Sequence, residues 1–452
     1  FSGKVLWKRE MGTWQPYKVP GRLLFPTDLY RRLVASKDRV YATLDIFGPV
    51  VALDAATGRT VRTYEGTELA REIVHSEGVL YVVTGTESPE KVDRRAMASW
   101  IRQEPRRLLA LDADTGRVLW EKDDADTESL IEMSLAVNGE RGYFQNTESL
   151  LCVDVESGET VWTAPRPSSY PRPAWAAPTL VAHGDVVVSA DRSVPRRVAE
   201  LTPGDEIPGK LAKKGTVRTG TVMAFSADTG KKLWEAPCAE GHFASVDVFV
   251  IDGKVFIGEK DKRKPRDYCT VRDLYTGEVV EKFESADEGW VDFHHHRCYR
   301  DKATQDFVLA GRTGVEFMDV ETGKIRPHHW IRGICRYGIL PCNGLLYLPP
   351  DQCGCYIQSK LTGFHVLAPA WHGKGMKGEW KWDKENRLQE GPAYAWAQKR
   401  DFSKGPVRDQ WPTYRHDRMR SGHAEQSLPA RGLKRAWTKK LGGRLTQPVV
   451  AD

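Results

Sequence analysis

Short apolar runs, each bounded by turn-forming residues, follow one another along most of the chain. Residues 108–111 and 118–120 are typical: they are rich in Leu, Val and Trp, and the turn between them reads Asp-x-x-Thr-Gly. This unit recurs at residues 54–58, 112–116, 154–158, 226–230, 273–277 and 319–323, with weaker copies at 2–7 and 361–363. Successive turn glycines lie from 40 (Gly323 to Gly363) to 72 (Gly158 to Gly230) residues apart. A period of about 40–50 residues is typical of four-stranded propeller blades, and longer spacings indicate inserted loops.

The residue types of this unit explain its geometry. Asp at the first position accepts hydrogen bonds from backbone N–H groups two residues on, and Gly at the last position adopts a positive φ without a Cβ clash. The Trp that follows, as at Trp120, carries a large ring that we expect to pack between neighbouring blades. The pattern therefore predicts an all-β fold, a β-propeller of about seven or eight four-stranded blades that is incomplete at the chain ends.

The last part of the chain breaks this pattern. Residues 371–410 are rich in Lys, Gly and Trp and show no strand alternation, and residues 411–450 look like the start of another propeller. We therefore expect residues 1–405 to form a propeller whose N-terminal part is missing, and residues 406–452 to form a linker and the start of a second propeller half. The chain begins without Met, so a signal peptide is expected to have been lost with the missing N-terminal part.

Composition and charge narrow the class of protein. The chain has 452 residues, with 67 Lys and Arg against 61 Asp and Glu, so its formal net charge is +6. Both signs are mixed throughout, and a nucleic-acid partner is not expected. No apolar stretch approaches the roughly 18 residues of a membrane-spanning helix, so no transmembrane segment is expected.

The repeat carries a family resemblance. Asp-x-x-Thr-Gly-x-x-x-Trp, as at residues 112–120, resembles the tryptophan-docking repeat of quinoprotein dehydrogenases and PQQ-like propeller proteins. That superfamily includes the propeller lipoprotein of the outer-membrane β-barrel assembly machine, which carries no cofactor. Residues 296–369 resemble large bacterial proteins known for PQQ-like repeats, in which two propeller halves follow one another. The resemblance implies a periplasmic or exported propeller and no particular activity, because function depends on sites and not on scaffolds.

Histidines cluster in one short stretch. Residues 293–300 read Phe-His-His-His-Arg-Cys-Tyr-Arg, and if they form a strand, His294, His296 and Cys298 lie on one face. Two imidazoles and a thiolate are suitable ligands for a transition metal such as Zn, Cu or Fe. The alternative is that these side chains line a loop and bind nothing. His294, His296 and Cys298 are therefore the candidate metal ligands.

Five of the eight cysteines lie within 58 residues of one another. Cys335 and Cys342, and the pair Cys353 and Cys355, are expected to form disulfides in an exported protein, with pairing between the two groups favoured over a strained Cys-Gly-Cys bond. Buried thiols and metal-bound thiolates are the alternatives.

Arginines and glycines follow the histidine cluster. Arg332, Arg336 and Asn343 are candidates for binding an acidic ligand such as an anionic sugar, since arginine holds a carboxylate in a bidentate fork. The alternative is a glycine-rich connection between blades with arginines in solvent. Tyr299 and Tyr337 are candidates for proton transfer if the protein is an enzyme.

Three functions follow from these candidates. The first is a ligand- or protein-binding scaffold of the bacterial cell envelope, with an envelope protein or a carbohydrate as partner. The second is a metal-assisted, lyase-like enzyme acting on acidic polysaccharides. The third is a PQQ-dependent dehydrogenase, for which the family's calcium ligands and adjacent cysteine pair have no match in this sequence. The sequence leaves open whether the protein is an enzyme.

Overall fold

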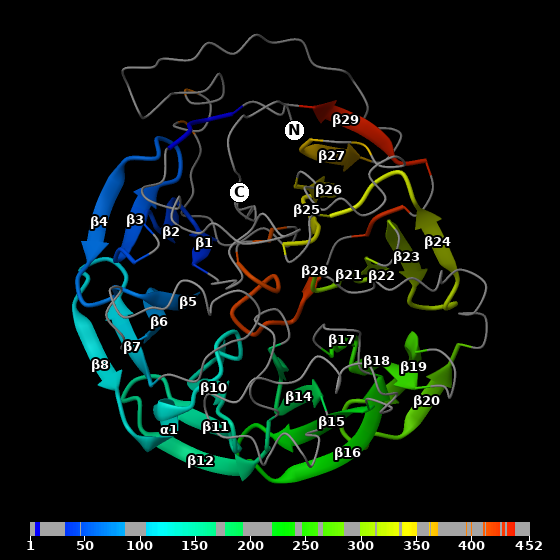
Figure 1. Ribbon diagram of the computed structural model, residues 1–452, viewed down its shortest axis with the longest axis horizontal. Coiled ribbons are helices and arrows are strands. Elements are labelled where there is room, and N and C mark those ends of the chain that lie inside the picture. The colour runs from blue at the N-terminus through cyan, green and yellow to red at the C-terminus, as the bar shows by residue number, and fades with distance from the viewer. Residues whose placement is uncertain are drawn as a thin grey trace, which may run out of the picture.

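The protein is a ring of seven mainly antiparallel sheets in a computed structural model (Figure 1). The structure describes residues 5–9, 32–45, 47–85, 105–168, 177–192, 219–239, 246–260, 265–283, 299–311, 314–333, 337–349, 363–368, 410–411, 413–424, 427–429 and 432–438, with Leu361, Ala395 and Lys399. Within these residues the predicted all-β propeller is confirmed, and the number of blades is seven. The described part of the chain contains one short helix, α1 (Ala125–Glu128), and no helix long and apolar enough to cross a membrane.

Each blade is a sheet of four main strands. Blade 1 holds β1 (Leu33–Ser36), β2 (Arg39–Thr43), β3 (Val50–Asp54) and β4 (Thr60–Tyr64), and blade 2 holds β5 (Ala70–Ser76), β6 (Val79–Gly85), β7 (Arg106–Asp112) and β8 (Val118–Lys122). Blade 3 holds β9 (Ala136–Asn138), β10 (Arg141–Gln145), β11 (Ser149–Asp154) and β12 (Thr160–Pro165), and blade 4 holds β13 (Thr179–His183), β14 (Val186–Arg192), β15 (Thr219–Ser226) and β16 (Lys232–Ala239). Blade 5 holds β17 (Phe249–Ile251), β18 (Lys254–Lys260), β19 (Pro265–Asp273) and β20 (Val279–Lys282).

Blades 6 and 7 take strands from distant parts of the chain. Blade 6 holds β21 (Lys302–Thr304), β22 (Phe307–Ala310), β23 (Val315–Asp319) and β24 (Ile325–His328), and β28 (His423–Ala424) adds a parallel inner strand to β21. Blade 7 holds β25 (Leu340–Cys342), β26 (Leu345–Leu348), β27 (His365–Ala368) and, as its outer strand, β29 (Lys434–Thr438). Two strands beyond residue 405 thus belong to this ring, while a second propeller half stays a prediction.

The strand order gives the ring two different faces. Because neighbouring strands are antiparallel, the turns from the first to the second strand and from the third to the fourth strand lie at the same end of a blade. We call this end the turn face. The connections from the second to the third strand, and the links from one blade to the next, lie at the opposite end, which we call the connection face.

The repeated turns have the predicted geometry. Asp112 Oδ1 accepts from the backbone N–H groups of Asp114 and Thr115 at 3.1 and 2.7 Å, and Gly116 has a φ of 77°. Hydrogen bonds from the Thr115 backbone and side chain lower the pKa of Asp112. The same bonds recur at Asp273, so the local sequence fixes these turns.

Aromatic side chains join neighbouring blades at these turns. Trp120, Trp162 and Trp234 donate from Nε1 to the carbonyls of Val155, Ala227 and Leu274 of the following blade, each at 2.8 Å. Trp7 makes the same 2.8 Å contact with Ala55 of blade 1. The rings lie against the turn glycines: a Cβ built on Gly277 would lie 2.5 Å from the Trp234 ring. The prediction that tryptophans pack between blades is confirmed.

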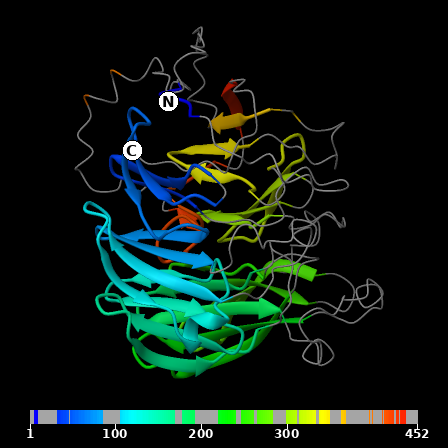
Figure 2. The ribbon, with the colours of Figure 1, turned by 60° about the vertical axis from the view of Figure 1, so that its left-hand side comes forward.

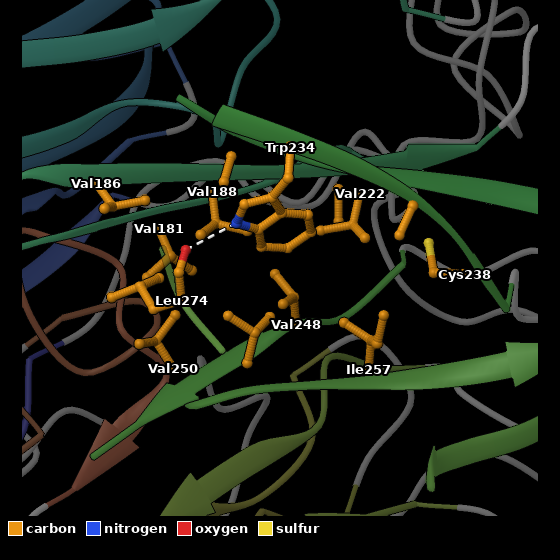
Figure 3. Packing of buried hydrophobic residues seen from close by; sticks show 14 of the residues in the cluster. Val181, Val186, Val188, Val222, Trp234, Cys238, Val248, Val250, Ile257 and Leu274 are labelled. Carbon is orange, nitrogen blue, oxygen red and sulfur yellow. Dashed lines mark hydrogen bonds between the residues drawn. The ribbon is translucent and has the colours of Figure 1, made fainter. Parts of the chain in front are cut away.

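The apolar core lies between the blades. Figure 3 shows the cluster between blades 4 and 5, where Trp234 covers valines of both sheets and its indole N–H points at the Leu274 carbonyl. Burying each such side chain is worth about 1.5–3 kcal/mol relative to exposure. The described cysteines, Cys152, Cys238, Cys269 and Cys342, are buried and form no disulfide, so the predicted disulfide at Cys342 is wrong. Cys342 lies instead in the packed core of blade 7.

Candidate functional site

The centre of the ring is filled by a segment from the C-terminal part of the chain. Residues 413–424, which we call the axial strap, run through the middle of the ring of blades (Figure 1), and Figure 2 shows this orange segment enclosed between blue and green blades. Its backbone bonds to inner strands of several blades. The N–H groups of Val137, Ala182 and Ala303 donate to the carbonyls of Arg418, Met419 and Gly422 at 2.8, 3.2 and 2.8 Å.

Arg420 ties the strap to blades 2 and 3. Its side chain is 1% exposed and donates from Nη2 to Glu72 Oε1 at 2.7 Å and from Nε to the carbonyl of Leu135 at 2.8 Å. Glu72 lies on the innermost strand of blade 2, and its other oxygen accepts from the backbone N–H of Met133 at 2.8 Å. Charge-assisted bonds of this kind are about twice as strong as neutral ones.

Arg415 ties the strap to blade 5. It donates from Nη2 to the carbonyl of Val248 at 2.8 Å, and its Nη1 lies 3.4 Å from Asp247 Oδ1. Arg300 donates to the same Asp247 oxygen at 2.9 Å. One buried carboxylate therefore lies between two buried guanidinium groups, and burial lowers the pKa of Arg415.

The strap folds upon itself before it meets the ring. Asp417 accepts from the backbone N–H and from Oγ of Ser421 at 3.0 and 2.7 Å, and Gly422 N–H donates to the Arg415 carbonyl at 2.8 Å. Burial alone would raise the pKa of Asp417, but hydrogen bonds from His416 and Ser421 lower it. Gly422 has a φ of 68°, and a Cβ there would lie 2.8 Å from Arg415 Nη2, so glycine is required at this position.

Two of the sequence-predicted residues meet near the connection face. The Arg332 guanidinium carbon lies 5.7 Å from the centre of the Tyr299 ring, and both side chains are buried. The Tyr299 hydroxyl donates to the Gly314 carbonyl at 3.4 Å, and its ring lies against Gly311 and Gly338. Tyr337, half-buried, is the neighbour of Gly338 in the chain. These residues belong to the links that lead into blades 6 and 7.

The other predicted residues do not join them. Asn343 lies in the turn between β25 and β26, on the turn face, where Asn343 and Gly344 have φ values of 52° and 68°. This is the Asn-Gly pattern of a tight hairpin, which explains Asn343 by backbone geometry. Arg336, and the predicted metal ligands His294, His296 and Cys298, lie outside the described residues, so the metal site stays a prediction. Within the described residues no group of three or more His, Cys, Asp or Glu side chains gathers as a metal site.

The axis does not fit a quinone cofactor with calcium. Among the described residues, Glu72 and Asp247 at the axis are bonded to Arg420, Arg415 and Arg300, and the strap passes between the inner strands. A planar cofactor and a divalent cation would need both the space and the carboxylates.

Sequence reasoning missed the axial residues. Glu72 and Arg420 are 348 positions apart, and no local pattern connects them. Trp411, Arg415 and Arg420 lie just after the stretch without strand alternation, within residues 406–452, for which the sequence predicts a linker and the start of a second propeller half.

The docked turns and the seven blades define a β-propeller of the tryptophan-docking class. The family model described as "Outer membrane protein assembly factor BamB" matches residues 1–165 and 148–272, and the chain belongs to this family. The predicted PQQ-like propeller family is therefore confirmed. No curated protein matches the chain in a sequence search.

Solved structures with similar folds share little sequence with this chain. BamB from Moraxella catarrhalis is 14% identical, with a TM-score of 0.47, over 81% of this chain and 88% of that one. The quinohemoprotein alcohol dehydrogenase ADHIIG from Pseudomonas putida HK5 is 15% identical, with a TM-score of 0.36, over 76% and 52%. The computationally designed Ika8 protein is 14% identical, with a TM-score of 0.38, over 72% and 94%. These similarities concern the fold alone.

Proposed function

We propose that the protein is a protein-binding scaffold of the cell envelope, which meets its partner with the connection face. The observation that supports this is the filled axis. Because the strap lies between the inner strands of the folded chain, a folded partner binds the ring from outside. The family description names an outer membrane protein assembly factor, and this supports a place at the cell envelope.

The difference between the two faces favours the connection face. The described turns between first and second strands are tight: β9 ends at Asn138 and β10 begins at Arg141, and β13 ends at His183 and β14 begins at Val186. The links between blades are longer and more varied, and one of them carries α1. Variable connections on a rigid scaffold are where binding residues concentrate.

Site-specific photocrosslinking in the cells that make the protein tests this proposal. A photoreactive phenylalanine analogue replaces the exposed residues Glu68 or Glu128 in blade links, and Glu156 or Asp185 on the turn face serve as matched controls. We expect the same protein adduct, identified by mass spectrometry, from both blade-link positions and none from the turn face. Equal adducts from both faces, or no adduct from either blade link, would contradict the proposal.

A further inference from the structure

The axis of the ring has the properties of a built binding site. Its acceptors come from three blades: the Glu72 carboxylate from blade 2, the Leu135 carbonyl from blade 3, and the Asp247 carboxylate and Val248 carbonyl from blade 5. All four accept from guanidinium groups of the strap. The planar fork of arginine matches such pairs of acceptors, and the point charge of lysine does not.

The ring orients these acceptors by itself. Glu72 Oε2 is fixed by the Met133 N–H at 2.8 Å, and Asp247 Oδ2 is fixed by the Asp301 N–H at 3.0 Å. Neither bond involves the strap, so the carboxylates keep their orientation through contacts within the blades. A carboxylate held in place before its partner arrives gives affinity without further ordering.

The strap in turn resembles a preformed ligand. The bonds from Asp417 to Ser421 and from Gly422 to Arg415 hold it in a compact loop that presents both guanidinium groups to the ring. Arg418, in contrast, points outward to Glu77, a residue on the turn face whose side chain is 71% exposed. The strap therefore has a binding side and an exposed side.

We propose that the axis is a binding site for a peptide with two arginines five positions apart, and that residues 413–424 are its intramolecular ligand. The ring and the strap form a receptor and ligand pair within one chain. The pair holds together without a covalent connection, and its specificity depends on guanidinium and not on positive charge alone. This inference does not depend on the proposed partner at the connection face.

The test cuts the full chain ahead of the strap, so that the C-terminal fragment carries the strap together with β29 of blade 7. A protease recognition sequence is inserted after Lys404, the purified chain is cleaved, and the fragments are passed over a sizing column. A fluorescently labelled synthetic peptide of residues 410–438 is then added, and its exchange into the ring is followed by anisotropy. We expect the cut chain to remain one complex and the labelled peptide to exchange into it.

Competing unlabelled peptides measure the specificity. A peptide with Arg415→Lys and Arg420→Lys should compete about 100-fold less well than the wild-type peptide, because an ammonium group cannot reach both the carboxylate and the carbonyl that each guanidinium group bonds. A peptide with Arg418→Lys, which changes only the exposed side, should compete within about 2-fold of wild type. Separation of the fragments from a folded ring, or equal competition by all three peptides, would overturn the proposal.

A second measurement uses the uncut chain, so that the proposal can be tested even if the cut chain unfolds. Hydrogen exchange at the amides of Val137, Ala182 and Ala303, which donate to the strap, should quicken at least about 10-fold in the Arg420→Lys variant. It should be unchanged in the Arg418→Lys variant. Equal exchange in both variants would overturn the proposal.

Discussion

We call the Asp-x-x-Thr-Gly turns, with the aromatic rings that pack on them, the rim of the ring. At the rim, Trp234 donates to the Leu274 carbonyl, 40 residues further along the chain, whereas at the axis Arg420 donates to Glu72, 348 residues away. The rim contact repeats from blade to blade and combines a buried ring with one neutral hydrogen bond. The axial contacts, Arg420 with Glu72 and Arg415 with Asp247, each join two buried charges and do not follow the blade repeat. The two regions therefore differ in how far apart in the sequence their contacting residues lie. They also differ in how much folding free energy is lost when a contact is removed.

The physical reason for the second difference is desolvation. The turn bonds at Asp112 and Asp273 are exposed, so water can replace them when they are lost. Glu72 is 0% exposed, and its carboxylate depends on Arg420 and two backbone N–H groups for every compensating interaction described. Removing Arg420 would leave a buried carboxylate with only these two N–H groups to compensate its charge.

The largest expected effect is at Arg420. The Arg420→Met substitution should lower the free energy of unfolding by about 3–5 kcal/mol, because it leaves Glu72 buried without a cation. Urea unfolding measures this. The control is Arg418→Met on the same strap, whose exposed pair with Glu77 should cost less than about 1 kcal/mol. Equal losses in the two variants would contradict a special role for the axis.

Two glycines in blade 5 allow the contribution of the Trp234 contact to the stability of the rim to be measured. Gly253 and Gly277 both have a φ of 71°, but a Cβ on Gly253 meets nothing within 4 Å, whereas one on Gly277 collides with Trp234. Gly253→Ala should cost about 1–2 kcal/mol for the left-handed backbone alone. Gly277→Ala should cost about 1–3 kcal/mol more, because the indole must move. Thermal unfolding of the two variants separates strain from docking, and equal melting temperatures would show that the contact with Trp234 is unimportant.

Acid should weaken the axis before it affects the rim. Burial, together with Lys37 and Arg418, lowers the pKa of His75 to about 4, and burial with His416 lowers that of His423 to about 4. In the unfolded chain these groups take up protons below their ordinary pKa of 6.5, while the folded chain stays neutral until about 4. The unfolded state therefore gains protons first, and stability falls between these values.

The expected loss is about 2 kcal/mol for each histidine by pH 5, and unfolding titrations at several pH values measure it. The variants His75→Gln and His423→Gln cannot gain the proton, so their stability should depend less on pH than that of the wild type. A dependence unchanged in both variants would refute this assignment.

The smallest expected effect is at an exposed rim pair. Arg141 and Asp154 lie 2.9 Å apart, and each side chain is 33% exposed. Arg141→Ala should change the free energy of unfolding by less than about 1 kcal/mol, since water and salt screen such pairs. A loss as large as that of Arg420→Met would remove the distinction between rim and axis.

The sequence predicts the rim because its determinants are local. Asp112, Thr115 and Gly116 make their turn with bonds across a few residues, and Trp120 follows at a fixed distance. One weaker copy of the unit is not a rim turn: Gly363 precedes β27, in the connection from β26, because the outer strand of blade 7 comes from residues 434–438.

No short sequence pattern of this kind predicts the contacts at the axis. Arg415 and Arg420 have their partners on blades 2, 3 and 5, far away in the sequence, and a sequence pattern cannot show that Asp247 and Glu72 lie at the same axis. The prediction that Cys342 forms a disulfide failed for a similar reason. A pairing inferred from cysteine spacing did not anticipate a thiol packed in the core of blade 7.

The most direct test of this account is a double-mutant cycle between Glu72 and Arg420. The variants Glu72→Gln, Arg420→Gln and the double variant are unfolded in urea beside the wild type. Residues in direct contact at a buried site couple by about 0.5–3 kcal/mol, and we expect a value of about 2 kcal/mol or more. A coupling below about 0.3 kcal/mol, as for distant independent sites, would show that the strap does not lie in the axis.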